Sequence, residues 1–87
     1  MTKREEYVAR RKAFFEKLES LGLSDISGYT LVNNYGYTFN YKGQRYDARH
    51  WLNVYGADVD YWDIMPNNVE LNEALNIIIK YDNGEDF

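Results

Sequence analysis

The first quarter of the chain carries apolar residues at the spacing of one helical face. These residues are Tyr7, Val8, Phe14, Phe15, Leu18 and Leu21. Thr2 and Glu5 fit a capping box, in which a hydroxyl and a carboxylate satisfy unpaired amides at a helix start. Gly22 suits the left-handed conformation that often follows the last helical residue. The pattern therefore predicts an amphipathic N-terminal helix over residues 3–21.

Two runs of β-branched and aromatic residues follow, at 29–32 and 37–41. The segment between them, 33–36, reads Asn-Asn-Tyr-Gly and is rich in turn-forming residues. This arrangement predicts a β-hairpin. The polar stretch 24–28 is expected to be a loop that connects the N-terminal helix to the hairpin.

A second tight turn is expected at Lys42-Gly43, after which residues 44–46 could add a short third strand. The pattern does not decide whether this third strand forms. Residues 28–46 are therefore expected to be an antiparallel hairpin or a three-stranded sheet.

A helical period returns after residue 46. Apolar residues lie at positions i, i+3, i+4 and i+7, namely Ala48, Trp51, Leu52 and Tyr55. Asp47 is a suitable N-cap and Gly56 interrupts the pattern, so a two-turn helix is expected between them. A second short helix is expected over residues 59–65, because Pro66 cannot continue it.

The last periodic segment predicts a helix over residues 70–81, and Ile77 to Ile79 are its ambiguous part. Its apolar face consists of Leu71, Ala74, Leu75, Ile78 and Tyr81. Three consecutive β-branched residues are equally compatible with a strand. The segments of the expected single α+β domain are the N-terminal helix (1–23), antiparallel β (28–46), a helical part (47–81) and a frayed tail (82–87).

Composition narrows the class of protein. The 87 residues include four Phe, nine Tyr, two Trp and no Cys, and 45% of positions are hydrophobic. Such a chain has enough apolar material for one core but must hold it without disulfides. No run approaches the roughly 20 apolar residues of a membrane span. The first residues lack the pattern of a secretory signal, and together with the missing cysteines this predicts a cytoplasmic protein.

Charge is distributed unevenly along the chain. The formal net charge is −4, but residues 1–20 carry six basic and four acidic groups. From residue 51 onward there is one base, Lys80, against eight acids, a balance of −7. A concentration of one sign of charge determines what a small domain attracts. The second half is expected to repel phosphate.

The residue types of most enzyme sites are missing. Cysteine nucleophiles are excluded, the serines lack an elbow motif, and the six glycines do not form a phosphate loop. The lone His50 is expected on the exposed arc of a helix. Asp58, Asp60 and Asp63 have spacing that could hold a hard cation, but no calcium-loop pattern or supporting Glu accompanies them. We therefore expect no catalysis, no cofactor and no metal.

The run from Tyr41 to Trp51, with Gly56 and the later triplet Glu73-Ala74-Leu75, resembles the small helix-turn-helix modules appended to phage and intron homing endonucleases. In those modules a hairpin with an aromatic-x-Gly turn leads into a helix with a buried Trp, a glycine turn and a recognition helix. The resemblance implies that Trp51 is buried and that residues 58–65 are the recognition helix. Three carboxylates in that segment oppose DNA phosphates, so this helix is not expected to read DNA.

The leading functional hypothesis is noncatalytic protein binding. Nine tyrosines cannot all be buried with satisfied hydroxyls in so small a domain, and exposed aromatic residues favour protein interfaces. The candidate partner-binding residues are Asp58, Asp60, Tyr61, Trp62 and Asp63. Their acidity predicts a basic host protein, such as a nucleic-acid enzyme, as the partner. Size, acidity and the lack of cysteine also resemble small bacteriophage host-takeover proteins, including anti-restriction and anti-CRISPR inhibitors, which implies an inhibitor in the host-cell cytoplasm.

The alternative hypothesis is direct nucleic-acid binding by a helix-turn-helix-like module. Its candidate residues are Lys42, Arg45 and Arg49, assisted by Arg10, Arg11 and Lys12. Six bases on one face could hold a phosphate backbone if the acids point away from it. Both hypotheses remain open at the level of sequence.

Overall fold

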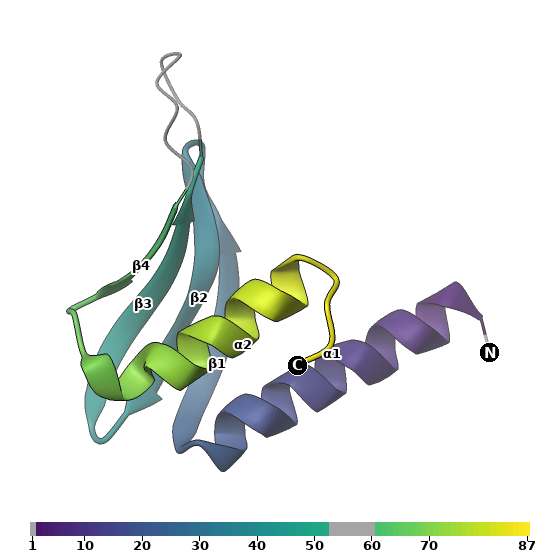
Figure 1. Cartoon of the computed structure of the whole chain (residues 1–87), viewed down its shortest axis with the longest axis horizontal. Coiled ribbons are helices and arrows are strands. Elements are labelled where there is room, and N and C mark those ends of the chain that lie inside the picture. Colours follow the sequence, from purple (N-terminus) through teal and green to yellow (C-terminus); the bar gives the residue numbers. More distant parts are fainter. Residues whose placement is uncertain (1, 53–60) are drawn as a thin grey trace.

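Residues 2–52 and 61–87 are described by the computed structural model, in which two α-helices lie against one face of a four-stranded antiparallel sheet (Figure 1). The elements are α1 (Lys3–Ser20), β1 (Leu23–Thr30), β2 (Asn34–Tyr41), β3 (Gln44–Trp51), β4 (Tyr61–Met65), the 3₁₀ turn η1 (Val69–Leu71) and α2 (Asn72–Asp82). Sheet order follows chain order, β1-β2-β3-β4. The predicted α+β class is confirmed. Neither α1 nor α2 is long and apolar enough to cross a membrane.

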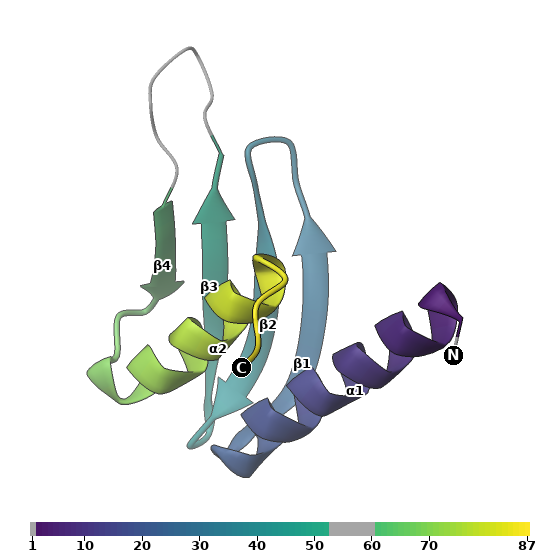
Figure 2. The ribbon, with the colours of Figure 1, turned by 45° about the vertical axis from the view of Figure 1, so that its right-hand side comes forward.

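Helix α1 begins as the capping box predicts, because the Thr2 hydroxyl accepts the Glu5 amide at 3.2 Å. Phe14 and Leu18 of the expected apolar stripe are fully buried. Tyr7 and Val8 instead remain 60% and 56% exposed. The first turns of α1 project beyond the sheet, so this part of the stripe has nothing to pack against (Figure 2).

The hairpin is confirmed, but both of its strands are longer than predicted. The expected loop at 24–28 is part of β1, which starts at Leu23. Its polar residues suited a loop, yet the strand accommodates them with a bulge, since the register shifts between Ser24 and Ser27 and Asp25 has a positive φ of 52°. The expected turn at 33–36 is shorter, because β2 already begins at Asn34.

The two short helices expected in the middle of the chain are wrong where the structure describes them. Residues 44–51 form β3 and residues 61–65 form β4, while 53–60 lie outside the described residues. In β3, Tyr46 and Ala48 are buried against the helices and alternate with Arg45, Asp47 and Arg49. This two-residue period fits a half-buried strand. The two helices implied by the resemblance to helix-turn-helix modules are therefore strands in the described part.

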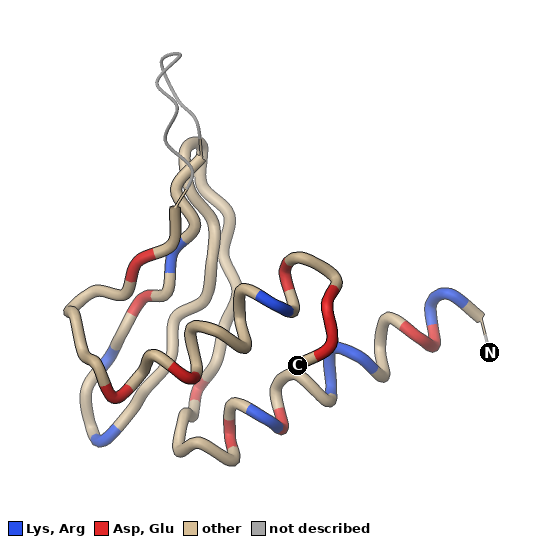
Figure 3. The backbone as a smooth tube through the Cα atoms, in the orientation of Figure 1, with Lys and Arg blue, Asp and Glu red and all other residues tan. Residues whose placement is uncertain are grey.

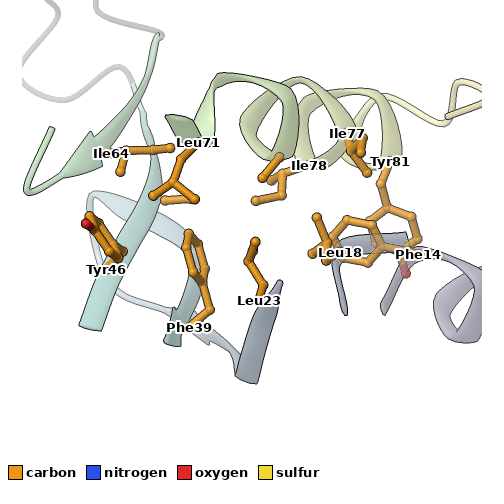
Figure 4. Packing of buried hydrophobic residues seen from close by; sticks show 12 residues of the cluster. Phe14, Leu18, Leu23, Phe39, Tyr46, Ile64, Leu71, Ile77, Ile78 and Tyr81 are labelled. Carbon is orange, nitrogen blue, oxygen red and sulfur yellow. The ribbon is translucent and has the colours of Figure 1, made fainter. Parts of the chain in front are cut away.

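Helix α2 resolves the ambiguity at Ile77 to Ile79, all of which are helical. It lies across the sheet with Ile77 and Ile78 buried (Figure 4). The core consists of Phe14, Leu18, Leu23, Phe39, Tyr46, Ala48, Ile64, Leu71, Ala74, Ile77, Ile78 and Tyr81. The two helices meet where the rings of Phe14 and Tyr81 stack in parallel, with centroids 3.9 Å apart.

The tail after α2 is held in place instead of fraying. Phe87 packs edge-on against Phe14 and Tyr81, each at 5.9 Å between ring centroids. The Arg10 guanidinium donates to the Tyr81 carbonyl at 3.0 Å and to the Glu85 carbonyl at 2.9 Å. One arginine of α1 therefore joins the end of α2 to the tail.

Candidate functional site

The sheet has one face covered by α1 and α2 and another that no helix in residues 2–52 and 61–87 covers (Figures 1 and 2). We call the second one the open face. Strand register places on it Tyr29, Asn34, Thr38, Arg45, Asp47, Arg49, Trp51, Tyr61, Asp63 and Met65. These side chains alternate with the core residues along each strand, as the pleat requires.

Gly36 pairs with Tyr29 on one side and Arg49 on the other, and these two residues are walls of a hollow in the open face. A Cβ atom on Gly36 would collide with the Ala48 carbonyl, so only glycine fits there. The hollow has a volume of about 300 Å³. Its walls are Tyr29, Leu31, Asn34, Thr38, Asp47 and Arg49.

Arg49 and Asp63 form the strongest polar contact on the open face. The guanidinium donates through Nε and Nη2 to the two carboxylate oxygens, at 3.0 and 2.9 Å. The guanidinium also lies 4.8 Å from the ring centroid of Trp51, whose Nε1 donates to Asp63 at 3.3 Å. The hydrogen bond to Asp63 is the main cause of the raised pKa of Arg49. A candidate acid and a candidate base therefore neutralise each other.

The predicted partner-binding residues do not share one surface. Tyr61 and Asp63 lie on the open face, and Tyr61 is 51% exposed. Trp62 points to the opposite face, where it packs against the core and stacks on His50 at 4.8 Å. Asp58 and Asp60 lie outside the described residues.

The predicted nucleic-acid-binding bases already have partners within the protein. Lys42 lies 3.0 Å from the Glu70 carboxylate, and this hydrogen bond raises the pKa of Lys42 and lowers that of Glu70. Arg45 donates to the Asp25 carbonyl, the Asn40 side chain and the Thr38 hydroxyl. Arg10, Arg11 and Lys12 lie on α1, across the sheet from the open face.

Basic and acidic positions are interspersed over the helices and the sheet (Figure 3). The acids of the second half therefore do not form one uniform acidic surface. Two of them, Asp63 and Glu70, are paired with bases from the first half, Arg49 and Lys42.

Two acceptors at the hollow have no donor within the described residues. The Oδ1 of Asn34, a residue only 6% exposed, is buried without a hydrogen bond, although its Nδ2 donates to Asn33. The Asp47 carboxylate lies on the wall of the hollow with neither a hydrogen bond nor an ion pair in that part of the chain. The Asn34 oxygen is closed off from a ligand by its burial, whereas the half-buried Asp47 carboxylate is open to a group that brings donors.

The pKa of Tyr29, on the wall of the hollow, is raised above its ordinary value. Burial raises this pKa most, the carboxylates of Asp47 and Asp63 raise it further, and the Arg49 charge opposes them. The sequence pattern around Asp47 suggested a helix cap, and neither Tyr29 nor Asn34 was a predicted site residue. The alternation of charged and apolar residues from Arg45 to Trp51 is the signal that could have identified this face.

His50 lies in a half-buried polar cluster instead of on a helix surface. The Tyr35 hydroxyl donates to Asp82 at 2.8 Å, and its oxygen lies 2.8 Å from His50 Nδ1. The cluster joins β2 and β3 to the end of α2 and contains no serine or cysteine nucleophile. The geometry of the cluster therefore indicates a structural role, in which its hydrogen bonds hold the end of α2 against the sheet.

No group of three His, Cys, Asp or Glu side chains that could hold a metal occurs in residues 2–52 and 61–87. Of the three aspartates considered as ligands, Asp58 and Asp60 lie outside those ranges. Comparison of the chain with protein-family models, with curated proteins and with solved structures gives no match.

Proposed function

We propose that this chain is a noncatalytic protein-binding domain whose open face contacts its partner. The observation that carries the proposal is that α1 and α2 cover the same side of the sheet, while Leu31, Tyr61 and Met65 are 59%, 51% and 51% exposed. Leu31 rims the hollow, and Tyr61 and Met65 lie on the open face. Aromatic residues, Met and Arg are enriched at protein interfaces, and an interface needs such a contiguous surface.

The partner that fits this face is basic. Asp47 on the wall of the hollow offers a carboxylate acceptor that a lysine or arginine side chain of the partner would satisfy. The Arg49 guanidinium repels such a basic side chain only weakly, because the Asp63 carboxylate accepts hydrogen bonds from its Nε and Nη2 and offsets its charge. Charge complementarity of this kind supports specific association and its rate.

A basic host protein that handles nucleic acid meets this requirement, and we propose it as the partner class. Binding to such a protein would inhibit it, as the resemblance to phage anti-restriction and anti-CRISPR proteins implies. The alternative, direct nucleic-acid binding, is less favoured because Lys42 and Arg49 are paired with carboxylates. Phosphate binding would have to break those pairs.

The test compares two variants against a panel of purified basic nucleases and other nucleic-acid enzymes. In the first variant Tyr61→Ser and Met65→Ser make the open face polar. In the control, Val69→Ser and Val8→Ser remove exposed apolar side chains elsewhere. We expect the first variant to bind a partner about tenfold more weakly, which corresponds to ~1.4 kcal/mol, and the control to bind like wild type.

Equal binding by both variants would contradict the use of the open face. Titration with duplex DNA and with RNA at two salt concentrations separates the alternative, because phosphate binding weakens steeply with salt. Salt-dependent binding of nucleic acid by the free domain would favour the alternative over the proposal.

A further inference from the structure

A second and larger hollow lies at the β1 edge of the sheet, between α1 and the first two strands. Its volume is about 580 Å³, and its walls are Arg11, residues 26–30 of β1 and residues 35–37 of β2. It exists because Gly28 pairs with Tyr37 and places no side chain in the space beside the ring. A Cβ on Gly28 would already lie 3.4 Å from that ring.

Arg11 is the charged group of this hollow, and it is partly buried. Its guanidinium lies 4.7 Å from the ring centroid of Phe15. Burial lowers the pKa of Arg11, but a hydrogen bond with Tyr81 and interactions with Tyr7, Tyr81 and Tyr37 outweigh that effect and raise it. All of these groups are phenols, which are neutral at pH 7.

The guanidinium of Arg11 therefore has no anionic partner among residues 2–52 and 61–87. Its neighbours on α1 already have strong acceptors, a carboxylate for Lys12 and backbone carbonyls for Arg10. Lys12 faces the Glu16 carboxylate at 4.0 Å, and Arg10 donates to two backbone carbonyls. A partly desolvated arginine without a counterion is a favourable anchor for an anion.

Further donors surround the same space. The half-buried Tyr37 has a hydroxyl with no hydrogen bond in the described ranges, and Thr30, which shares its face of the sheet, adds an aliphatic hydroxyl. Burial is the main cause of the raised pKa of Tyr37, and the Arg11 charge opposes it, which indicates that both groups face one space. Since β1 is an edge strand, alternate backbone amides point away from β2.

One carboxylate lies nearby and has to be considered. Asp82 contributes to the raised pKa of Tyr37, so its charge reaches the hollow. Its Oδ2 already accepts the hydroxyl proton of Tyr35, and it is not among the walls of the hollow. Its distance from Arg11 exceeds that of an ion pair, so the guanidinium remains available.

We propose that this hollow binds a small ligand through an anionic oxygen group, either a carboxylate or a phosphate, with Arg11 as the anchor. The guanidinium would donate two parallel hydrogen bonds to two ligand oxygens. Tyr37 and the edge of β1 would hold the rest of the group. The site has its anchor on α1, shares only Tyr29 with the hollow on the open face, and does not depend on the protein-binding proposal.

The test follows backbone amide and Arg Nε signals by NMR during titration with sodium phosphate, sodium acetate and sodium chloride at matched ionic strength. We expect saturable shifts at Arg11, Gly28 and Thr30 with phosphate or acetate, and none with chloride. Arg11→Gln should weaken this binding at least about tenfold. The matched control, Lys12→Gln on the next residue of α1, should bind as wild type does.

The titrations with different anions also identify the chemical class of the ligand. Saturation by phosphate alone indicates a phosphate ester, and saturation by acetate indicates a carboxylate. Gly-Gly-Gly with a free C-terminus, compared with its amide, then distinguishes a peptide end from a free acid. The proposal is overturned if no saturable shift occurs at β1, or if Arg11→Gln and Lys12→Gln bind equally. The amide spectrum of each variant shows directly whether it is folded.

Discussion

Arg49 of β3 and Asp63 of β4 lie directly opposite each other in the sheet and are joined by two hydrogen bonds of 3.0 and 2.9 Å. The nucleic-acid-binding hypothesis relied on Arg49, and the protein-binding hypothesis relied on Asp63. Their pairing removes a free charge from each hypothesis. What remains on the open face is Asp47, which has no ion pair within residues 2–52 and 61–87, and a group of apolar and aromatic side chains.

A double-mutant cycle with Arg49→Gln and Asp63→Asn measures this contact. The side chains are 21% and 32% exposed, so solvent and salt screen the pair in part. We expect a coupling of about 1 kcal/mol in the free energy of unfolding, obtained from urea denaturation. Lys12 and Glu16, which are far more exposed, serve as the control pair and should couple more weakly. Equal coupling energies in the two cycles would show that the Arg49–Asp63 pair stabilises the fold no more than an exposed ion pair does.

Gly36→Ala should destabilise the protein more than the same change at Gly43. At Gly36 the added Cβ meets the Ala48 carbonyl, so two central strands have to separate, and we expect a loss of at least about 2 kcal/mol. At Gly43 nothing lies within 4 Å of the Cβ, but φ is 78°, so the cost is about 1 kcal/mol from the backbone. Denaturant midpoints of the two variants check the order, and the reverse order would contradict the close approach.

Phe14→Leu tests the stack between the two helices. Phe14 is fully buried and contacts Tyr81, Tyr37, Phe15 and Phe87 through its ring. Replacing the ring by a smaller aliphatic group should cost about 1–3 kcal/mol in unfolding free energy. Val8→Ala on the exposed part of α1 should change stability by less than about 0.5 kcal/mol. A thermal or urea transition of Phe14→Leu that coincides with wild type would refute the stack as a core element.

Alkaline pH should destabilise the protein through Tyr37. Burial holds the pKa of this phenol above its ordinary value of about 10. Its contribution to stability is therefore complete below the pKa of the unfolded chain and is lost as the pH rises through the folded pKa. Tyr37→Phe should retain more of its neutral-pH stability above pH ~10 than wild type does. Tyr7→Phe, at an exposed phenol, should not, and identical alkaline loss in all three proteins would count against the assignment.

Local signals predicted the two helices well and the middle of the chain poorly. The Thr2 cap and the apolar period of residues 70–81 lie within single elements, so the sequence alone could identify α1 and α2. For residues 47–55, apolar spacing was compatible with a helix, whereas the strand β3 depends on pairing with β2 and β4. Distant partners decide such segments, and a single sequence does not show them.

The same uncertainty affected the candidate site. Tyr61 and Asp63 were grouped on the assumption of a helix, and they share the open face because positions i and i+2 lie on one face of a strand. Trp62 was grouped with them, yet the two-residue period places it against His50 on the other side. The hollow could not be predicted, because its residues come from β1, β2 and β3 and meet only through strand register.

The contact of α1 with α2 has a consequence for how the protein is made on the ribosome. Phe14 and Leu18 are synthesised more than 60 residues before Tyr81, whose ring stacks on Phe14. Until α2 has left the ribosome, the apolar side chains of α1 in the nascent chain are uncovered. Exposed apolar surface of this kind favours chaperone binding and aggregation. Arg10 also connects α1 to the end of α2 and the tail, through hydrogen bonds to the backbone carbonyls of residues 81 and 85. The finished fold is therefore accessible only after translation of α2, and slow translation of that segment would lengthen the vulnerable period.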